Sequence, residues 1–339
     1  MVWEVVGQTK AVSLLQQSLK KETVAHAYLL VGPPHVGKMT LALDLAKALN
    51  CEGTEPPCGV CPSCQKIASD KHADVQIIGL SGGGNAAETK PQAEIGIDQI
   101  RQMQHSANLP PFEGRYKVFI IDGAELLSNE AANCLLKTLE EPVGKVIFIL
   151  LTINERLLLA TVISRCQRLE LPPLAAAEIE TALNSRGVVE PEKARLLARI
   201  SHGCLGWALS ATGDEGVLQQ RAERMDRLLG VIDADCEERF AYAAQLAAQF
   251  GQNRGPVQEI LDLWLDYWRD LLLIKIGCDE AITNADMLAT LVEQARGYDL
   301  VQIRSFIDSI QAAGEQLMQN ANPRLVLEVL MLSIPERGE

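Results

Sequence analysis

Short apolar segments alternate with amphipathic stretches through the first half of the chain. Four apolar segments predict buried strands, and they are 26–31, 75–80, 117–122 and 145–152. Three segments with apolar residues at helical spacing predict helices, and they are 40–49, 97–107 and 126–139. Strands that alternate with helices in this way predict a parallel sheet covered by helices on both faces.

The strand pattern ends at the Leu-Pro-Pro-Leu segment 171–174, and helical patterns follow it. Residues 178–211 predict a small helical unit, and residues 216–334 predict a larger one. Trp264 and Trp268 lie four residues apart in the larger unit, a spacing that favours core packing over a binding site. In the first half, the glycine-rich polar segment 81–92 predicts a flexible loop.

Charge and hydropathy limit the classes of function. The chain has 339 residues, with 31 basic against 44 acidic side chains and a net charge of −13. This balance argues against a protein that binds nucleic acid by itself, because phosphate contacts need a basic face. It leaves open a role at DNA within a larger assembly. No apolar run approaches the length of a membrane span, and the N-terminus has no secretory signal pattern, so we expect a cytoplasmic protein.

A glycine-rich loop follows the first predicted strand. Gly32, Gly37 and Lys38 match the phosphate-loop pattern, in which backbone N–H groups and a lysine bind phosphate oxygens. The position that normally supplies a hydroxyl to Mg²⁺ holds Met39, whose thioether does not bind a hard cation. Thr40 comes next and points about 100° further around the helix. The pattern predicts phosphate binding but not Mg²⁺-dependent hydrolysis.

A carboxylate ends the third predicted strand. Asp122 stands where P-loop NTPases place a second carboxylate that orients the metal ion. It is also placed to cap the helix that follows, and both roles can hold together. The next acidic residue, Glu125, is displaced along the chain, and a carboxylate moved by several ångströms loses the alignment that general-base catalysis needs.

Four cysteines, Cys51, Cys58, Cys61 and Cys64, have C-x6-C-x2-C-x2-C spacing behind the phosphate-loop helix. Four thiolates at such spacing can form the tetrahedron of a structural zinc site, which leaves no open position for catalysis. A disulfide framework is disfavoured, because the other five cysteines are scattered singly and no secretory signal is present. An iron–sulfur cluster is the stronger alternative, but Ala68 stands where a ferredoxin-type run would place its last cysteine.

Further motifs resemble one family. Residues 135–142, Leu-Leu-Lys-Thr-Leu-Glu-Glu-Pro, and 163–166, Ile-Ser-Arg-Cys, resemble the AAA+ clamp-loader subunits of bacterial DNA polymerase III. Residues 3–8 resemble their adenine-contacting box, and the cysteine module sits at the same place as theirs. The resemblance covers the chain well to about residue 171. It implies a P-loop AAA+ domain at 1–171 with a zinc module at 51–64, a helical lid at 172–213 and an all-α collar domain for oligomerisation at 214–339.

The chain departs from the ATPase members of this family, the tau/gamma subunits, at three motifs. Those subunits keep a hydroxyl after the loop lysine, a glutamate after the strand-end aspartate and a sensor arginine in the lid. Here these positions hold Met39, Gly123 and Gly206. The chain therefore resembles the delta-prime branch, with the fold kept and hydrolysis lost. The resemblance implies a degenerate site in which ATP or ADP is not hydrolysed, formed by Gly32, Gly37, Lys38, Thr40 and Asp122.

The resemblance also implies a role for Arg165, in the Ser-Arg-Cys motif. In the family this arginine enters the nucleotide site of the neighbouring subunit as an arginine finger in trans; the alternative is an ordinary surface charge. The implied partners are tau/gamma and delta subunits in a hetero-oligomer expected to be a pentamer, the sliding clamp, and primed DNA reached through the complex. No catalytic residue is expected in cis.

Two other functions stay open at the level of sequence. An active tau/gamma-like ATPase would need the metal-binding hydroxyl and the catalytic glutamate. A zinc-containing P-loop kinase for a small molecule is disfavoured by the Ser-Arg-Cys motif and by the long helical half.

Overall fold

The computed structural model describes residues 3–80, 94–141, 144–187, 189–319 and 321–337. The chain divides into two compact units, each described here by itself. The α/β unit comprises Met1–Ala182 and His202–Trp207, and the helical unit comprises Leu183–Ser201 and Ala208–Glu339. The predicted flexible loop at 81–92 lies outside the described residues.

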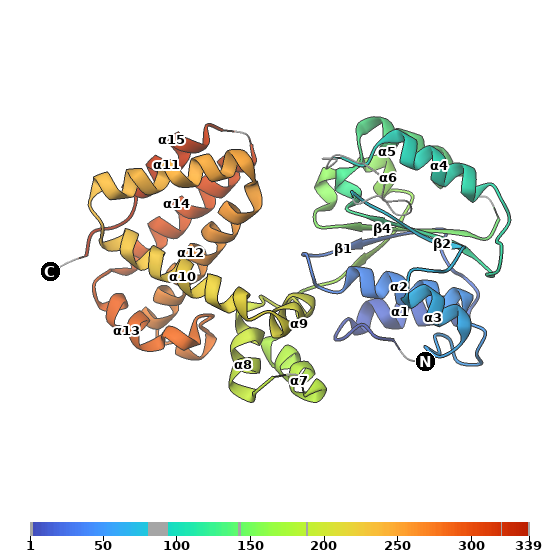
Figure 1. Cartoon of the computed structure of the whole chain (residues 1–339), viewed down its shortest axis with the longest axis horizontal. Coiled ribbons are helices and arrows are strands. Elements are labelled where there is room, and N and C mark those ends of the chain that lie inside the picture. Colours follow the sequence, from blue (N-terminus) through green and yellow to red (C-terminus); the bar gives the residue numbers. More distant parts are fainter. Residues whose placement is uncertain (1–2, 81–93, 142–143, 188, 320, 338–339) are drawn as a thin grey trace. The chain divides into compact units, whose positions relative to one another are not determined.

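A five-stranded parallel sheet forms the centre of the α/β unit (Figure 1). Its strands are β1 (Ala27–Val31), β2 (Val75–Ile78), β3 (Lys117–Asp122), β4 (Val146–Thr152) and β5 (Gln167–Glu170). Their order in the sheet is β2-β3-β4-β1-β5, and every neighbouring pair is parallel. The four predicted strands are confirmed. The apolar pattern did not predict β5, an edge strand in which Leu169 alone is buried.

Helices cover both faces of this sheet, as predicted (Figure 1). They are α1 (Thr9–Lys20), α2 (Lys38–Asn50), α3 (Pro62–Ala68), α4 (Ile97–Ala107), α5 (Asn129–Glu140) and α6 (Ala160–Ile163), with 3-10 turns η1 (Ala124–Leu126) and η2 (Glu155–Leu157). Strand side chains alternate between the two faces. Tyr28 belongs to the core that includes Leu41 of α2, whereas Leu29 belongs to the core that includes Leu135 of α5.

The helical unit is built around α12. Its helices are α8 (Pro191–Ile200), α10 (Glu215–Asp233), α11 (Cys236–Gln252), α12 (Arg254–Lys275), α13 (Leu288–Arg296), α14 (Leu300–Met318) and α15 (Pro323–Leu332), with η3 (Asp279–Ala281) and η4 (Ala285–Met287). Two further helices, α7 (Ala176–Arg186) and α9 (Leu205–Gly213), contribute residues to both units. Trp264 and Trp268 are almost completely buried, and both rings pack against Phe306. Their predicted role in the core is confirmed.

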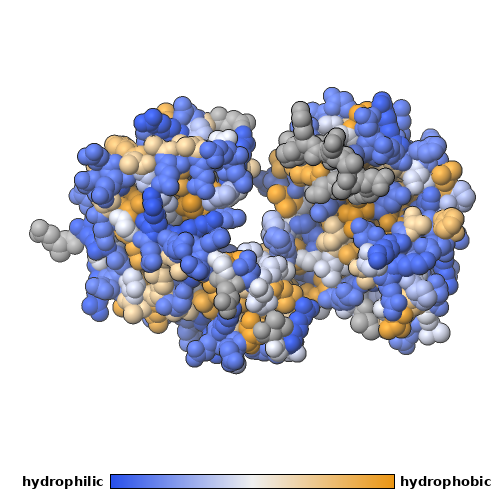
Figure 2. Space-filling model, viewed as in Figure 1, coloured by the Kyte–Doolittle hydropathy of each residue, from blue (hydrophilic) through white to orange (hydrophobic). Residues whose placement is uncertain are grey.

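The surface of both units is mainly hydrophilic on the face that Figure 2 shows, with smaller hydrophobic patches between the polar residues. Among the described residues, none of the helices combines the length and the apolar character that crossing a membrane requires.

Candidate functional site

The phosphate loop joins β1 to α2. Gly32 lies so close to a neighbouring segment that an added Cβ would come within 2.5 Å of the carbonyl oxygen of Leu171. Gly37 has φ of 107°, a conformation that L side chains rarely adopt, and it forms the N-cap of α2. Both glycines are therefore required by the backbone, and the strand–loop–helix context of the motif is present.

The ammonium group of Lys38 is directed at its own loop. Its Nζ donates hydrogen bonds to the carbonyl oxygens of Gly32 at 2.5 Å and of Pro33 at 2.7 Å. Burial lowers the pKa of Lys38, while the charges of Glu125 and Asp122 oppose that shift. A phosphate would have to compete with the loop carbonyls for this cation.

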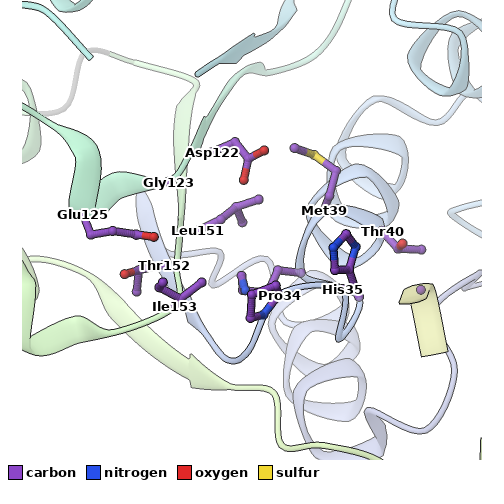
Figure 3. A pocket seen from close by; sticks show the side chains of 13 residues that line it. Pro34, His35, Met39, Thr40, Asp122, Gly123, Glu125, Leu151, Thr152 and Ile153 are labelled. Atoms are coloured by element: carbon purple, nitrogen blue, oxygen red, sulfur yellow. The ribbon is translucent and has the colours of Figure 1, made fainter. Parts of the chain in front are cut away.

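Lys38 lines an open pocket of about 400 Å³. Figure 3 shows this pocket from close by. The pocket is lined by Pro34, His35, Gly37, Lys38, Met39, Thr40, Asp122, Gly123, Glu125, Leu151, Thr152, Ile153 and Gly206. Asp122 and Met39 face each other across it, and Thr40 lies further around α2 (Figure 3). Four of the five residues of the predicted nucleotide site line this pocket, and the fifth, Gly32, accepts the hydrogen bond from Lys38 described above.

The three positions that depart from the ATPase pattern line the same pocket. Met39, Gly123 and Gly206 all contribute to its wall. The amide of Gly206 donates a 2.9 Å hydrogen bond to the carbonyl oxygen of His35, and an added Cβ there would lie 2.7 Å from that oxygen. The described backbone therefore leaves no space for a side chain at position 206.

One sequence expectation around Asp122 needs correction. The N-cap of η1 is Gly123, and the N-cap of α5 is Ser128, whose side chain accepts a hydrogen bond from Ala131 N–H. Asp122 thus caps neither helix. Glu125 lies in η1 and lines the pocket wall, where it points toward Thr152 (Figure 3). The turn at Gly123, with φ of 78°, brings this about, and linear spacing along the chain did not reveal it. The loss of general-base alignment at Glu125 stays a prediction.

The four cysteines converge. Their Sγ atoms all lie within 4.8 Å of one another. A Zn–S distance of about 2.3 Å in a tetrahedron gives S–S separations of roughly 3.8 Å, so the cluster fits a four-thiolate site. Backbone N–H groups of Gly53, Cys61 and Cys64 donate to sulfur atoms of the cluster at 3.3 to 3.5 Å. The cluster can hold a metal ion.

The environment shifts the pKa values of Cys51, Cys58 and Cys64, and not all in the same direction. The backbone N–H groups of Val60 and Cys61 lower the pKa of Cys58 to about 6. Burial raises the pKa of Cys51, and it raises that of Cys64 to about 12. A dication would have to displace protons from the buried thiols, so metal binding at this site should release protons.

Arg165 follows α6 on the surface of the α/β unit, with a side chain that is 31% exposed. Its Nη1 donates to the carbonyl oxygen of Thr161 at 2.8 Å, and its Nη2 donates to Glu140 Oε1 at 2.5 Å. Glu140 was not predicted as its partner, because the two residues belong to different motifs.

The fold and the phosphate loop together define a P-loop protein of the AAA+ class. Family models described as "DNA polymerase III, delta subunit" and "DNA polymerase III, delta subunit, C terminal" match residues 7–175 and 217–336. DNA polymerase III subunit delta-prime of Bacillus subtilis is 30% identical over 97% of this chain and 96% of its own length. The chain belongs to the delta-prime family of DNA polymerase III clamp-loader subunits.

Two further likenesses are more limited. DNA polymerase III subunit tau of Escherichia coli is 36% identical over 68% of this chain, and the match spans 36% of that protein. A solved structure, a DNA polymerase III gamma subunit-related protein of Thermotoga maritima, is 18% identical and covers 95% of this chain and 99% of its own. Its TM-score is 0.40, which is too low to support a functional conclusion.

Proposed function

We propose that this clamp-loader subunit does not hydrolyse ATP and that it assists hydrolysis in a neighbouring subunit through Arg165. The observation that supports the first part is the shared location of Met39, Gly123 and Gly206 in one pocket. At these positions the active pattern has a ligand for Mg²⁺, a base for the attacking water and a cation for the γ-phosphate. Their joint loss removes the charge stabilisation on which phosphoryl transfer depends.

Nucleotide binding in the pocket is a separate matter from hydrolysis. ATP or ADP entering it would meet Lys38 already bonded to the loop, together with the carboxylates of Asp122 and Glu125. Under this proposal the pocket is a degenerate nucleotide site: any nucleotide held there stays unhydrolysed, and its binding is weakened by that competition.

The metal in the cysteine cluster is proposed to be Zn²⁺ in a structural role. The choice rests on four thiolate donors at compatible separations, with each cysteine supplying one ligand. When bound, the ion would fix the module that follows α2. The four cysteines would hold it, and no open position would remain for a substrate.

The proposal includes the assembly. The partners are tau/gamma and delta subunits in a hetero-oligomer expected to be a pentamer, which loads the sliding clamp on primed DNA in the cytoplasm. Residues 172–213 would be the lid and residues 214–339 the collar domain that joins the subunits. Support comes from membership of the family and from the resemblance of the motifs.

The test replaces Arg165 in a reconstituted clamp loader. Arg165→Ala should lower clamp- and DNA-stimulated ATP hydrolysis, because a γ-phosphate in the adjoining site loses a cation. Arginine fingers are worth about 10³ or more in rate in GTPases, and several ATP sites in one complex would make the observed loss smaller. Lysine should rescue poorly, because it lacks the planar donor fork. Unchanged hydrolysis and clamp-loading rates would refute this role and would mean that Arg165 is an ordinary surface charge.

A further inference from the structure

Arg165 is fixed by groups at the ends of two different helices. Glu140, the last residue of α5, accepts a hydrogen bond from Nη2 of Arg165 at 2.5 Å. Thr161, in α6, accepts one from Nη1 through its carbonyl oxygen at 2.8 Å. A third, longer contact of 3.4 Å joins Nη1 to Ser164 Oγ. The guanidinium is therefore held at its tip rather than left free in solvent.

Stability alone does not explain a glutamate at this place. The C-terminus of a helix carries partial negative charge, so an acidic residue in the last turn is electrostatically unfavourable. The Glu140 side chain is 50% exposed and that of Arg165 is 31% exposed. Ion pairs this exposed contribute little to folding, because water screens them and two long side chains must be ordered.

The geometry suits a positioning role better. Guanidinium has five N–H donors in a planar fork, and the bonds to Glu140 and Thr161 use two of them. The remaining donors can still meet phosphate oxygens. An arginine that is already ordered loses less conformational freedom when it reaches a phosphate, and small displacements of a catalytic group lower rates strongly.

We propose that Glu140 is a positioning residue that holds Arg165 ready for the neighbour's nucleotide. This inference rests on the proposed function of Arg165 in trans. It assigns to Glu140, from the Leu-Leu-Lys-Thr-Leu-Glu-Glu-Pro motif, a role in the reaction that is exerted only through Arg165.

The test compares two variants of Glu140 in the reconstituted complex. Glu140→Ala removes the acceptor and should lower kcat for ATP about threefold to tenfold, with KM unchanged, because the finger is less well placed. Glu140→Gln keeps an acceptor oxygen without the charge and should restore a rate close to that of wild type. Glu141→Ala is the matched control, since it removes the adjacent exposed carboxylate, and it should leave the rate unchanged.

A double variant separates this inference from the proposed function. If Glu140 acts through Arg165, then Arg165→Ala with Glu140→Ala should be no slower than Arg165→Ala alone. The positioning role is refuted by a wild-type or faster rate in Glu140→Ala, by equal losses in the Ala and Gln variants, or by additive losses in the double variant. In each of these cases a slow Arg165→Ala would leave the proposed function standing. An unaffected Arg165→Ala would refute both. Size-exclusion chromatography and thermal melting verify that every variant folds and assembles.

Discussion

Two cations of the α/β unit show opposite arrangements. Lys38 is 9% exposed and is bonded to the backbone of its own loop, beside a pocket in which three positions depart from the ATPase pattern. Arg165 lies at the surface, held by Glu140 and Thr161 while other donors stay accessible. The lysine of the phosphate loop is thus bonded within its own loop. Arg165, outside that motif, is the cation that we propose to act on another molecule.

The difference shows why a motif match does not by itself assign an activity. A phosphate loop can persist because its glycines and lysine stabilise the connection between β1 and α2. Whether it also catalyses depends on the groups around it. In this chain those groups include Met39, Gly123 and Gly206.

The largest expected effect comes from the cysteine cluster. It tests whether the metal-binding module that follows α2 also stabilises the surroundings of Lys38 or Arg165. Cys61→Ser should lower the zinc content from close to one ion per chain and destabilise the module. Structural zinc contributes about 10–16 kcal/mol of apparent binding free energy in finger peptides, and that energy is folding energy. Hydrogen exchange should rise in residues 51–74 and in 112–116, since Asn50 Oδ1 accepts from the amides of Arg115 and Tyr116.

The control for this experiment is Cys236→Ser, which changes an exposed cysteine of the helical unit. It should keep both metal content and exchange rates. Iron with a visible charge-transfer band would rule out zinc. Faster exchange throughout α6 in Cys61→Ser would show that the module also supports the helix beside Arg165, which would weaken the contrast between the two regions.

A smaller effect is expected at Gly206, which lines the pocket and packs tightly against His35. Gly206→Ala should lower the free energy of unfolding by about 1–3 kcal/mol, as overpacking does, because its Cβ would meet the His35 carbonyl oxygen at 2.7 Å. Gly213→Ala adds the same atom to the same helix where nothing lies within 4 Å, and it should be neutral or slightly stabilising. Chemical denaturation measures both. Equal stability of the two variants would mean that the loop yields easily and that a sensor arginine could be accommodated.

The smallest expected change is in hydrolysis by the isolated chain. Wild type should show no ATPase activity above background, and Met39→Thr should not gain any, because residues of one catalytic unit act non-additively. A steady-state assay with Mg²⁺ and ATP measures this, and heat-treated protein gives the background. Robust turnover by the wild-type protein would favour an active tau/gamma-like ATPase instead. The tau subunit of Escherichia coli, a member of that group, is 36% identical over 68% of this chain.

The fold followed from the sequence wherever burial imposed a pattern. Strands β3 and β4 have apolar centres because both faces of the sheet are covered, so their residue types reveal them. The edge strand β5 has one buried residue, Leu169, among polar and charged neighbours, and it carries no such signal. Its place is set by pairing with β1, a long-range effect that local pattern does not encode.

The candidate site was predictable only in part for a similar reason. The four cysteines and the phosphate loop are local in sequence, and the structure brings their members together. Glu125 returns to the pocket through a turn at Gly123 with positive φ, and Glu140 reaches Arg165 across 25 residues. Both placements depend on backbone geometry and packing, so spacing along the chain could not supply them.

The central claim is that this chain acts in its neighbour's site and not in its own. The most direct measurement is the clamp- and DNA-stimulated ATPase rate of two reconstituted complexes, one with Lys38→Ala and one with Arg165→Ala in this subunit. The account predicts a rate close to wild type for Lys38→Ala and a severalfold or larger loss for Arg165→Ala. A greater loss with Lys38→Ala than with Arg165→Ala would contradict it.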